Sequence, residues 1–164
     1  ALTRRFAALA PMLVDALQAV HAAGFLHGDL KPENVLVELG ERLVLITHEG
    51  RMSGRRYQTP AEVVEHDTVT DEYIVCAGLG RSSDWYRNLV ARPALRVQVG
   101  NRSWEPRQRL LDVTEAADRF ARYEHRHPRT AKRLLAWMGR SYDGSDAGRL
   151  AMMDEMPMVA FGRR

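Results

Sequence analysis

The stretch LVLITHEGRMSGRRYQTPAEVVE, residues 43–65, decides the fold. Leu43–His48 is apolar and rich in β-branched residues, which is typical of a strand. Residues 50–56 are rich in Gly, Ser and Arg, as turns are, and Tyr57–Glu65 has the composition of a second strand. We therefore expect two strands joined by a tight turn that carries three arginines.

The sequence that follows predicts more strands, with helices grouped between the later ones. Leu95, Val97 and Val99 alternate with polar residues, the period-two pattern of a half-buried strand. Strands are expected at 73–77, 95–99, 103–111 and 157–161, and helices at 85–92, from a cap at Thr114 to the break at His127-Pro128, and from there to Gly139. Residues 141–149, rich in Gly, Asp and Ser, are expected to form a loop. A largely antiparallel sheet with segregated helices indicates an α+β fold.

The sequence before residue 43 predicts an attachment made of a helix and a hairpin. Apolar residues recur at spacings of three and four over residues 3–23, which indicates a helix with one apolar face. The short apolar runs 34–37 and 43–46 lie on either side of Gly40, which is typical of a hairpin.

Residues 27–37, HGDLKPENVLV, resemble the catalytic loop of a protein kinase, and the resemblance covers about residues 3–46. In that family the position of Asp29 accepts the substrate hydroxyl proton, and the position of Asn34 holds magnesium. Kinase chemistry also needs a Gly-rich lid and a DFG aspartate, but Thr47-His48-Glu49-Gly50 follows where that aspartate is expected. We therefore expect no kinase activity. Residues 1–42 are expected to be an incomplete kinase-like segment, and residues 43–164 the functional domain.

Composition narrows the class of protein. The 164 residues suffice for one domain with a short attachment, and 45% hydrophobic with 27% charged residues is the composition of a globular protein. No apolar run approaches the ~18 residues of a membrane span. Lys31 and Lys132 are the only lysines, so the formal charge of +3 comes from arginine, whose guanidinium suits phosphate and carboxylate. Because the arginines are scattered among acids, a small anionic ligand is expected rather than nucleic acid.

The single cysteine, Cys76, excludes an internal disulfide and a multi-cysteine zinc site. It also suits a cytoplasmic protein. We expect no metal site.

Three motifs, in order and spacing, resemble the deazaflavin-dependent nitroreductase family across about residues 43–164. They are Gly50-Arg51-Met52-Ser53-Gly54 with Thr59-Pro60, then Asp84-Trp85-Tyr86-Arg87-Asn88-Leu89 with Pro93, and the closing Pro157-Met158-Val159-Ala160-Phe161. The resemblance implies a split β-barrel of the flavin-reductase and pyridoxamine-oxidase type. It also implies coenzyme F-420 as the cofactor, a deazaflavin with a phosphate and an oligoglutamate tail.

The local chemistry fits an anionic coenzyme. Arg51, Arg55 and Arg56 lie on a turn whose glycines allow backbone amides to approach an anion. The resemblance implies that this turn, the strand after it and a helix start line the coenzyme groove. The implied contacts are Arg51, Met52, Ser53, Arg55, Tyr57, Gln58, Thr59, Pro60, Asp84, Trp85, Tyr86, Arg87 and Asn88, with backbone contacts along the ring from Val75, Cys76, Ala77 and Gly78. Family members commonly carry a basic residue at the position of Met52 and arginine at that of Tyr57, so the tail site here has lost charge.

The resemblance implies an oxidoreductase that transfers hydride from reduced F-420 to an organic acceptor such as a quinone, a nitro compound or an enone. Tyr123, His125 and His127 are candidate proton donors or positioning groups. Two alternatives stay open: an FMN- or haem-binding barrel, and a non-catalytic hybrid that carries a kinase-derived segment. The sequence does not decide the oligomeric state.

Overall fold

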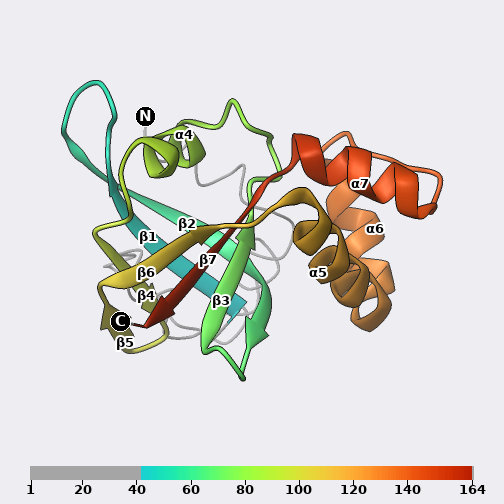
Figure 1. Ribbon diagram of the computed structural model, residues 1–164, viewed down its shortest axis with the longest axis horizontal. Coiled ribbons are helices and arrows are strands. Elements are labelled where there is room, and N and C mark those ends of the chain that lie inside the picture. Colours follow the sequence, from blue (N-terminus) through green and yellow to red (C-terminus); the bar gives the residue numbers. More distant parts are fainter. Residues whose placement is uncertain (1–41, 164) are drawn as a thin grey trace, which may run out of the picture. The chain divides into compact units, whose positions relative to one another are not determined.

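Seven strands form one antiparallel sheet that curls into a split barrel (Figure 1). The structure, a computed structural model, describes residues 42–163. The strand order is β5-β4-β1-β2-β3-β7-β6, and each neighbouring pair in it is antiparallel. The elements are β1 (Leu43–Glu49), β2 (Arg56–Asp67), β3 (Glu72–Cys76), α4 (Asp84–Ala91), β4 (Arg96–Val99), β5 (Arg102–Trp104), β6 (Pro106–Leu110), α5 (Val113–Arg126), α6 (Pro128–Trp137), α7 (Asp146–Glu155) and β7 (Met158–Arg163). The predicted α+β split barrel is confirmed.

Strand β2 belongs to both halves of the barrel. Its first part pairs with β1, from Glu49↔Arg56 to Leu43↔Glu62. Its second part pairs with β3, and the register shifts between Val63 and Glu65. Such a bulge bends a strand and increases its twist, which lets one strand of 12 residues turn from one half-sheet into the other.

The sheet is buried on both faces where β3 and β7 pair. Tyr73 and Val75 join an apolar cluster with Val44, Ile46 and Leu89 of α4, whereas Ile74, between them, packs with the helices. This alternation is the period-two rule at work, since successive side chains of a strand point to opposite faces. Helices α5, α6 and α7 gather beside one end of the barrel (Figure 1) and cover the second face with Phe120, Leu135, Met152, Met153 and Met156.

Two predictions about the segment 103–114 were wrong. The segment 103–111 is not one strand: β5 ends at Trp104, and β6 begins at Pro106 and pairs with β7. Proline lacks an amide hydrogen and restricts the residue before it, which favours a break there. Helix α5 is capped by Asp112 rather than Thr114, because the Asp112 carboxylate accepts the Glu115 amide hydrogen at 2.8 Å.

The expected loop at 141–149 runs into a helix. Helix α7 begins at Asp146, where the Ser145 hydroxyl accepts the Gly148 amide hydrogen at 3.0 Å. The Gly, Asp and Ser residues that indicated a loop are therefore the capping segment of a helix, as these residue types allow. Met152 and Met153 fasten the helix to the core.

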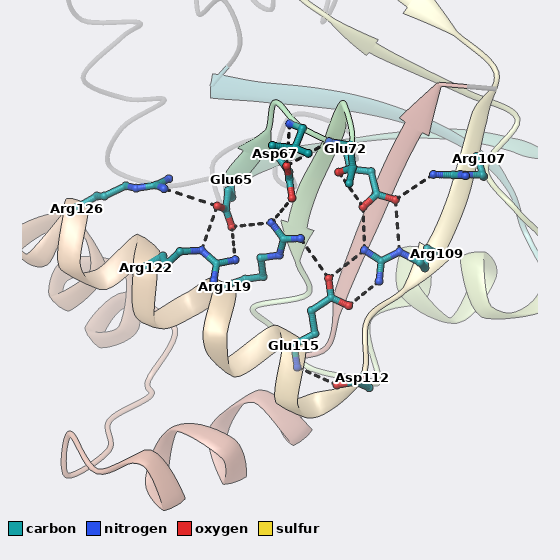
Figure 2. A network of polar contacts seen from close by, with 12 residues as sticks. Glu65, Asp67, Glu72, Arg107, Arg109, Asp112, Glu115, Arg119, Arg122 and Arg126 are labelled. Atoms are coloured by element: carbon teal, nitrogen blue, oxygen red, sulfur yellow. Dashed lines mark hydrogen bonds and ion pairs between the residues drawn. The ribbon is translucent and has the colours of Figure 1, made fainter.

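A network of ion pairs holds α5 against the β2–β3 hairpin and β6 (Figure 2). Arg119, 11% exposed, donates to Asp67 at 2.7 Å and to Glu65 at 3.2 Å. The side chains of Glu65 and Glu72 are more than 90% buried, and Glu72 accepts a hydrogen bond from Arg109 at 2.8 Å. Buried charges are tolerated only when they are paired in this way.

The predicted helix at 3–23, the hairpin strand at 34–37 and the kinase-like loop lie outside the described residues. Within residues 42–163, no helix has the length and apolar character needed to cross a bilayer.

Candidate functional site

The β1–β2 turn is closed by its own backbone. The Gly50 amide donates to the Arg55 carbonyl and the Gly54 amide to the Gly50 carbonyl, each at 2.8 Å. A Cβ at Gly50 would lie 2.6 Å from Ser53 Oγ and 2.8 Å from the Tyr57 ring, and Gly54 has a φ of +64°, which favours glycine. Gly50 is therefore required by the packing of this turn, whereas at Gly54 only the backbone conformation favours glycine.

Arg51 fastens the turn to helix α4. Its amide and its guanidinium Nη1 both donate to Oδ1 of Asn88, each at 3.0 Å. Nη1 also contacts Asp84 Oδ1 at 3.0 Å, on the first turn of the same helix. Asn88 is 4% exposed, whereas 69% of the Asp84 side chain is exposed, so the junction runs from the surface into the interior. The structure thus brings three of the predicted site residues, far apart in sequence, into direct contact.

A buried histidine extends the junction into the barrel. The Nδ1 atom of His48 lies 3.3 Å from Nδ2 of Asn88, and its Nε2 atom lies 3.1 Å from Oγ1 of Thr59. His48 is 3% exposed, and burial lowers the pKa of its imidazole. The sequence prediction missed this residue, although His48 shares the inward face of β1 with Val44 and Ile46 and so could have been recognised as a buried polar group.

The outer surface of the turn carries cations and polar groups. Arg55 and Arg56 are exposed, and Met52 is 90% exposed. The Ser53 hydroxyl serves the turn itself: it accepts the Arg55 amide at 3.3 Å and lies 3.4 Å from the Tyr57 hydroxyl. Of the remaining predicted positions on β2, Gln58 is exposed and Thr59 and Pro60 are half-buried.

The start of α4 presents a mixture of exposed and packed groups. Asp84 and Arg87 are exposed, whereas Tyr86 packs in the barrel core and Trp85 lies against its edge. The N-cap residue is Ser83, but its hydroxyl does not cap the helix. Within the described part of the chain, this buried oxygen has no hydrogen-bond partner. A buried polar atom of this kind at a helix N-terminus can serve an anion or a water.

The predicted ring-contact segment is largely engaged with the protein. Val75 pairs with both β2 and β7, and the Ala77 amide donates to Pro157 at 2.8 Å. Cys76 donates to the Met156 carbonyl, and a Cβ at Gly78 would clash with the sulfur of Met138. This segment is therefore packed against the helical cluster, and its contact with a coenzyme stays a prediction.

Tyr123 is one of three candidate proton donors, and the structure pairs it with Glu62 of β2. Its hydroxyl donates to Glu62 Oε1 at 3.1 Å, and burial raises the pKa of both groups. The His127 ring lies 5.4 Å from the Tyr123 ring, at the end of α5. His125 and His127 are exposed. Glu62 was not singled out from the sequence, because nothing in a strand pattern marks a half-buried carboxylate.

A model of the F420H(2)-dependent quinone reductase family matches residues 33–140. Among solved structures, the chain is similar to an F420-H2 dependent reductase (FDR-A), with 21% identity and a TM-score of 0.50 over 74% of this chain and 95% of that chain. It is also similar to a structure described as a domain-swapped dimer, with 20% identity and a TM-score of 0.51 over 90% of this chain and 98% of that chain.

A stretch of 43 residues is 49% identical to the serine/threonine-protein kinase PKH3 of Saccharomyces cerevisiae. This stretch is 26% of the chain but only 4% of the kinase, so the chain spans a very small part of that curated relative. The family match, by contrast, begins at residue 33, before the predicted domain boundary at 43.

The sheet topology defines a split β-barrel, a fold that the chain shares with the solved F420-H2 dependent reductase. The chain belongs to the F420H(2)-dependent quinone reductase family, whose model matches well over half of it. The predicted deazaflavin-dependent family, its cofactor F-420 and its class, an oxidoreductase, are thereby confirmed.

Proposed function

We propose that the β1–β2 turn and the start of α4 bind the anionic part of coenzyme F-420, and that the protein passes hydride to a quinone, a nitro compound or an enone. The observation that carries this proposal is the Arg51–Asn88 junction, since it joins the two motifs in one place. Arg55 and Arg56 lie exposed on that same turn.

The donor set fits the charge of the coenzyme. Guanidinium groups hold phosphate and carboxylate through paired hydrogen bonds, and two exposed arginines stand on the turn. The first turn of α4 adds free amide hydrogens and the positive end of a helix dipole, beside the unpartnered Ser83 hydroxyl. Arg51 is already neutralised by Asp84, so we assign it to shaping the turn and Arg55 and Arg56 to the anion.

The other implied positions complete the proposed groove. Met52, Ser53, Tyr57, Gln58, Thr59 and Pro60 would flank the coenzyme from the turn and β2, Trp85, Tyr86 and Arg87 from α4, and Val75, Cys76, Ala77 and Gly78 through their backbone. Met52 and Tyr57 bring contact area rather than charge, so the tail is held mainly by Arg55 and Arg56.

When bound, reduced F-420 supplies hydride from its ring carbon C5. The chain positions the acceptor, excludes water and holds a proton for the reduced product. For that proton we propose Tyr123, with His125 and His127 as the alternatives. The Tyr123 phenol is protonated at neutral pH, and its hydrogen bond to Glu62 holds the hydroxyl in place.

The proposed setting is a cytoplasmic protein that does not bind nucleic acid, with a functional domain at 43–164 after a kinase-derived segment at 1–42. The kinase-like stretch carries no proposed activity. The proposed proton donor and the proposed anion site both lie in the functional domain.

A fluorescence titration of the full chain with F-420 tests the site. The double variant Arg55→Ala/Arg56→Ala should bind ~10- to 100-fold more weakly, because the charge-assisted hydrogen bonds lost with both exposed arginines are together worth ~1.5–3 kcal/mol. Arg129→Ala removes an exposed arginine from α6 and is the matched control. Equal binding by the double variant and the wild type would contradict the anion site, and tighter binding of FMN or haem would favour the alternative cofactors.

A further inference from the structure

His48 lies two residues before the turn, on the inward face of β1, and the proposed mechanism does not use it. Its ring is 3% exposed and bridges Asn88 of α4 to Thr59 of β2. A buried imidazole between two polar partners has its protons assigned by those partners.

The partners fix one tautomer. The Arg51 amide and guanidinium can only donate, so the Asn88 atom that receives both is its carbonyl oxygen. The other end of the Asn88 amide is then an NH₂ group, and it faces Nδ1 of His48 at 3.3 Å. Nδ1 must therefore be the bare acceptor, and the proton lies on Nε2, from where it donates to the Thr59 hydroxyl at 3.1 Å.

The surroundings of His48 are nearly free of charge. From β2 it meets Thr59 and the Tyr57 ring, stacked at 6.0 Å, and from α4 it meets Asn88. On its own strand the Glu49 backbone hydrogen-bonds to the imidazole and raises its pKa, but by less than burial lowers it. Among residues 42–163, no carboxylate makes a hydrogen bond or an ion pair with either ring nitrogen. The nearest charged groups along the chain, Glu49 with its partner Arg92 and the Arg51 guanidinium, contact other atoms.

We propose that His48 is a positioning residue whose neutral imidazole fixes the orientation of the Asn88 amide and thereby holds the coenzyme-binding turn, so that protonation of His48 releases the turn. The proposal rests on the proposed function of that turn. Protonation places an N–H at Nδ1, directly opposite the NH₂ of Asn88. Turning the Asn88 amide over relieves this clash only by setting its NH₂ against the two donors of Arg51.

The pH dependence follows from the sign of the change. His48 is neutral at pH 7 and becomes charged only as the pH falls through its pKa, which burial holds below the ordinary value. Coenzyme affinity should therefore be constant at pH 7 and above, and it should fall only at a pH below ~6.5, once His48 takes up its second ring proton.

Two variants distinguish the loss of the acceptor atom of His48 from the protonation of its imidazole. His48→Asn keeps an acceptor oxygen near the position of Nδ1 but cannot be protonated, so we expect F-420 affinity within ~3-fold of the wild type at pH 7 and no His48-dependent loss at pH 5. His48→Leu leaves the Asn88 NH₂ without a partner, and we expect binding ~10-fold weaker at every pH. Because His48→Asn and the wild type meet the same coenzyme, protonation of the ligand cancels in their comparison.

A second measurement needs no coenzyme. Nitrogen NMR of the free protein, assigned by the signals that His48→Asn removes, should show His48 with its proton on Nε2. Asn88→Asp replaces the facing NH₂ by a carboxylate oxygen and should raise the pKa of His48. Either the opposite tautomer or an unshifted pKa in Asn88→Asp would overturn the assignment.

The two proposals fail differently. If Arg55→Ala/Arg56→Ala binds F-420 like the wild type, the anion site is wrong, whatever His48 does. If that double variant loses affinity while His48→Asn loses affinity at pH 5 in parallel with the wild type, the site stands and His48 has no positioning role.

Discussion

The β1–β2 turn depends on a single missing side chain. A Cβ at position 50 would lie 2.6 Å from Ser53 Oγ and 2.8 Å from the Tyr57 ring. Gly50→Ala should therefore destabilise the protein by ~1–3 kcal/mol through overpacking, as measured by urea unfolding. Gly54→Asn is the matched control, because the space there is open and Asn tolerates the positive φ. A Gly50→Ala protein as stable as Gly54→Asn would contradict the packing of this turn.

Glu62 carries a charge at a cost to the fold. Burial raises the pKa of its carboxyl. The hydrogen bond from Tyr123 and the charges of Arg42 and His127 lower this pKa, but by less than burial raises it. A raised pKa means that ionisation at neutral pH destabilises the folded state, and this cost disappears below the pKa of the unfolded chain. Glu62→Gln should therefore be more stable than the wild type at pH 8, with no advantage at pH 4.

Urea unfolding at the two pH values measures this difference. Tyr123→Phe, which removes the hydroxyl partner, is the control: it should not share the pH-dependent gain, because it leaves the carboxyl in place. A Glu62→Gln advantage of equal size at pH 4 and pH 8 would show that titration of Glu62 is not the cause.

Among elements, α5 is held to the hairpin by charge. The pKa of Asp67 is lowered to about 2, and the hydrogen bond from Arg119 of α5 is the largest cause. A lowered pKa gives stability that is present above the unfolded value and is lost as the pH falls toward 2. The stability difference between wild type and Asp67→Asn should accordingly be constant from pH 7 to ~5 and vanish near pH 2. A difference that persists at pH 2 in urea titrations would contradict the ion pair.

Helix α7 depends on a short polar cap. Ser145→Ala removes the acceptor for the Gly148 amide and should cost ~1 kcal/mol. Ser141→Ala, at an exposed position in the preceding segment, should be neutral. Thermal unfolding of the two variants measures the contrast, and equal melting temperatures would contradict the cap.

These elements show why some predictions from sequence succeed. Strand β1, the turn and β2 are adjacent in the chain, so composition and turn residues suffice to predict them. Helix α7 was missed because Ser145 and Gly148 are typical of loops as well as caps. The break at Pro106 was missed because its two strands pair with β4 and β7, which depends on partners distant in sequence.

At the scale of the whole molecule, the motifs predicted the family and the barrel, but not the contacts inside the site. Arg51 and Asn88 come into contact only in the folded barrel, so the spacing of residues in the sequence could not predict their hydrogen bonds. His48 was overlooked because its role depends on Asn88, 40 residues later. The coenzyme contacts of the predicted residues remain a prediction, which the F-420 titrations test.

The reactivity of Cys76 depends on how the helical cluster of α5, α6 and α7 packs against the barrel. Its thiol lies against the methionine-rich helical cluster, and burial raises its pKa to about 12. Native protein at pH 8 should therefore react with a thiol reagent more than ~100-fold slower than unfolded protein. Rapid labelling of the native protein would mean that the helical cluster opens independently of the barrel.

The bulge in β2 makes the spacing of that strand a long-range constraint. Removing Val64 would take away one residue at the register shift between Val63 and Glu65. Glu65 and Asp67 could still pair with Ile74 and Glu72, because Val64 is the extra residue of the bulge and has no partner of its own on β3. The strand would instead lose the bend that carries it from one half-sheet into the other, so one deletion, far from any ligand, would oppose closure of the barrel.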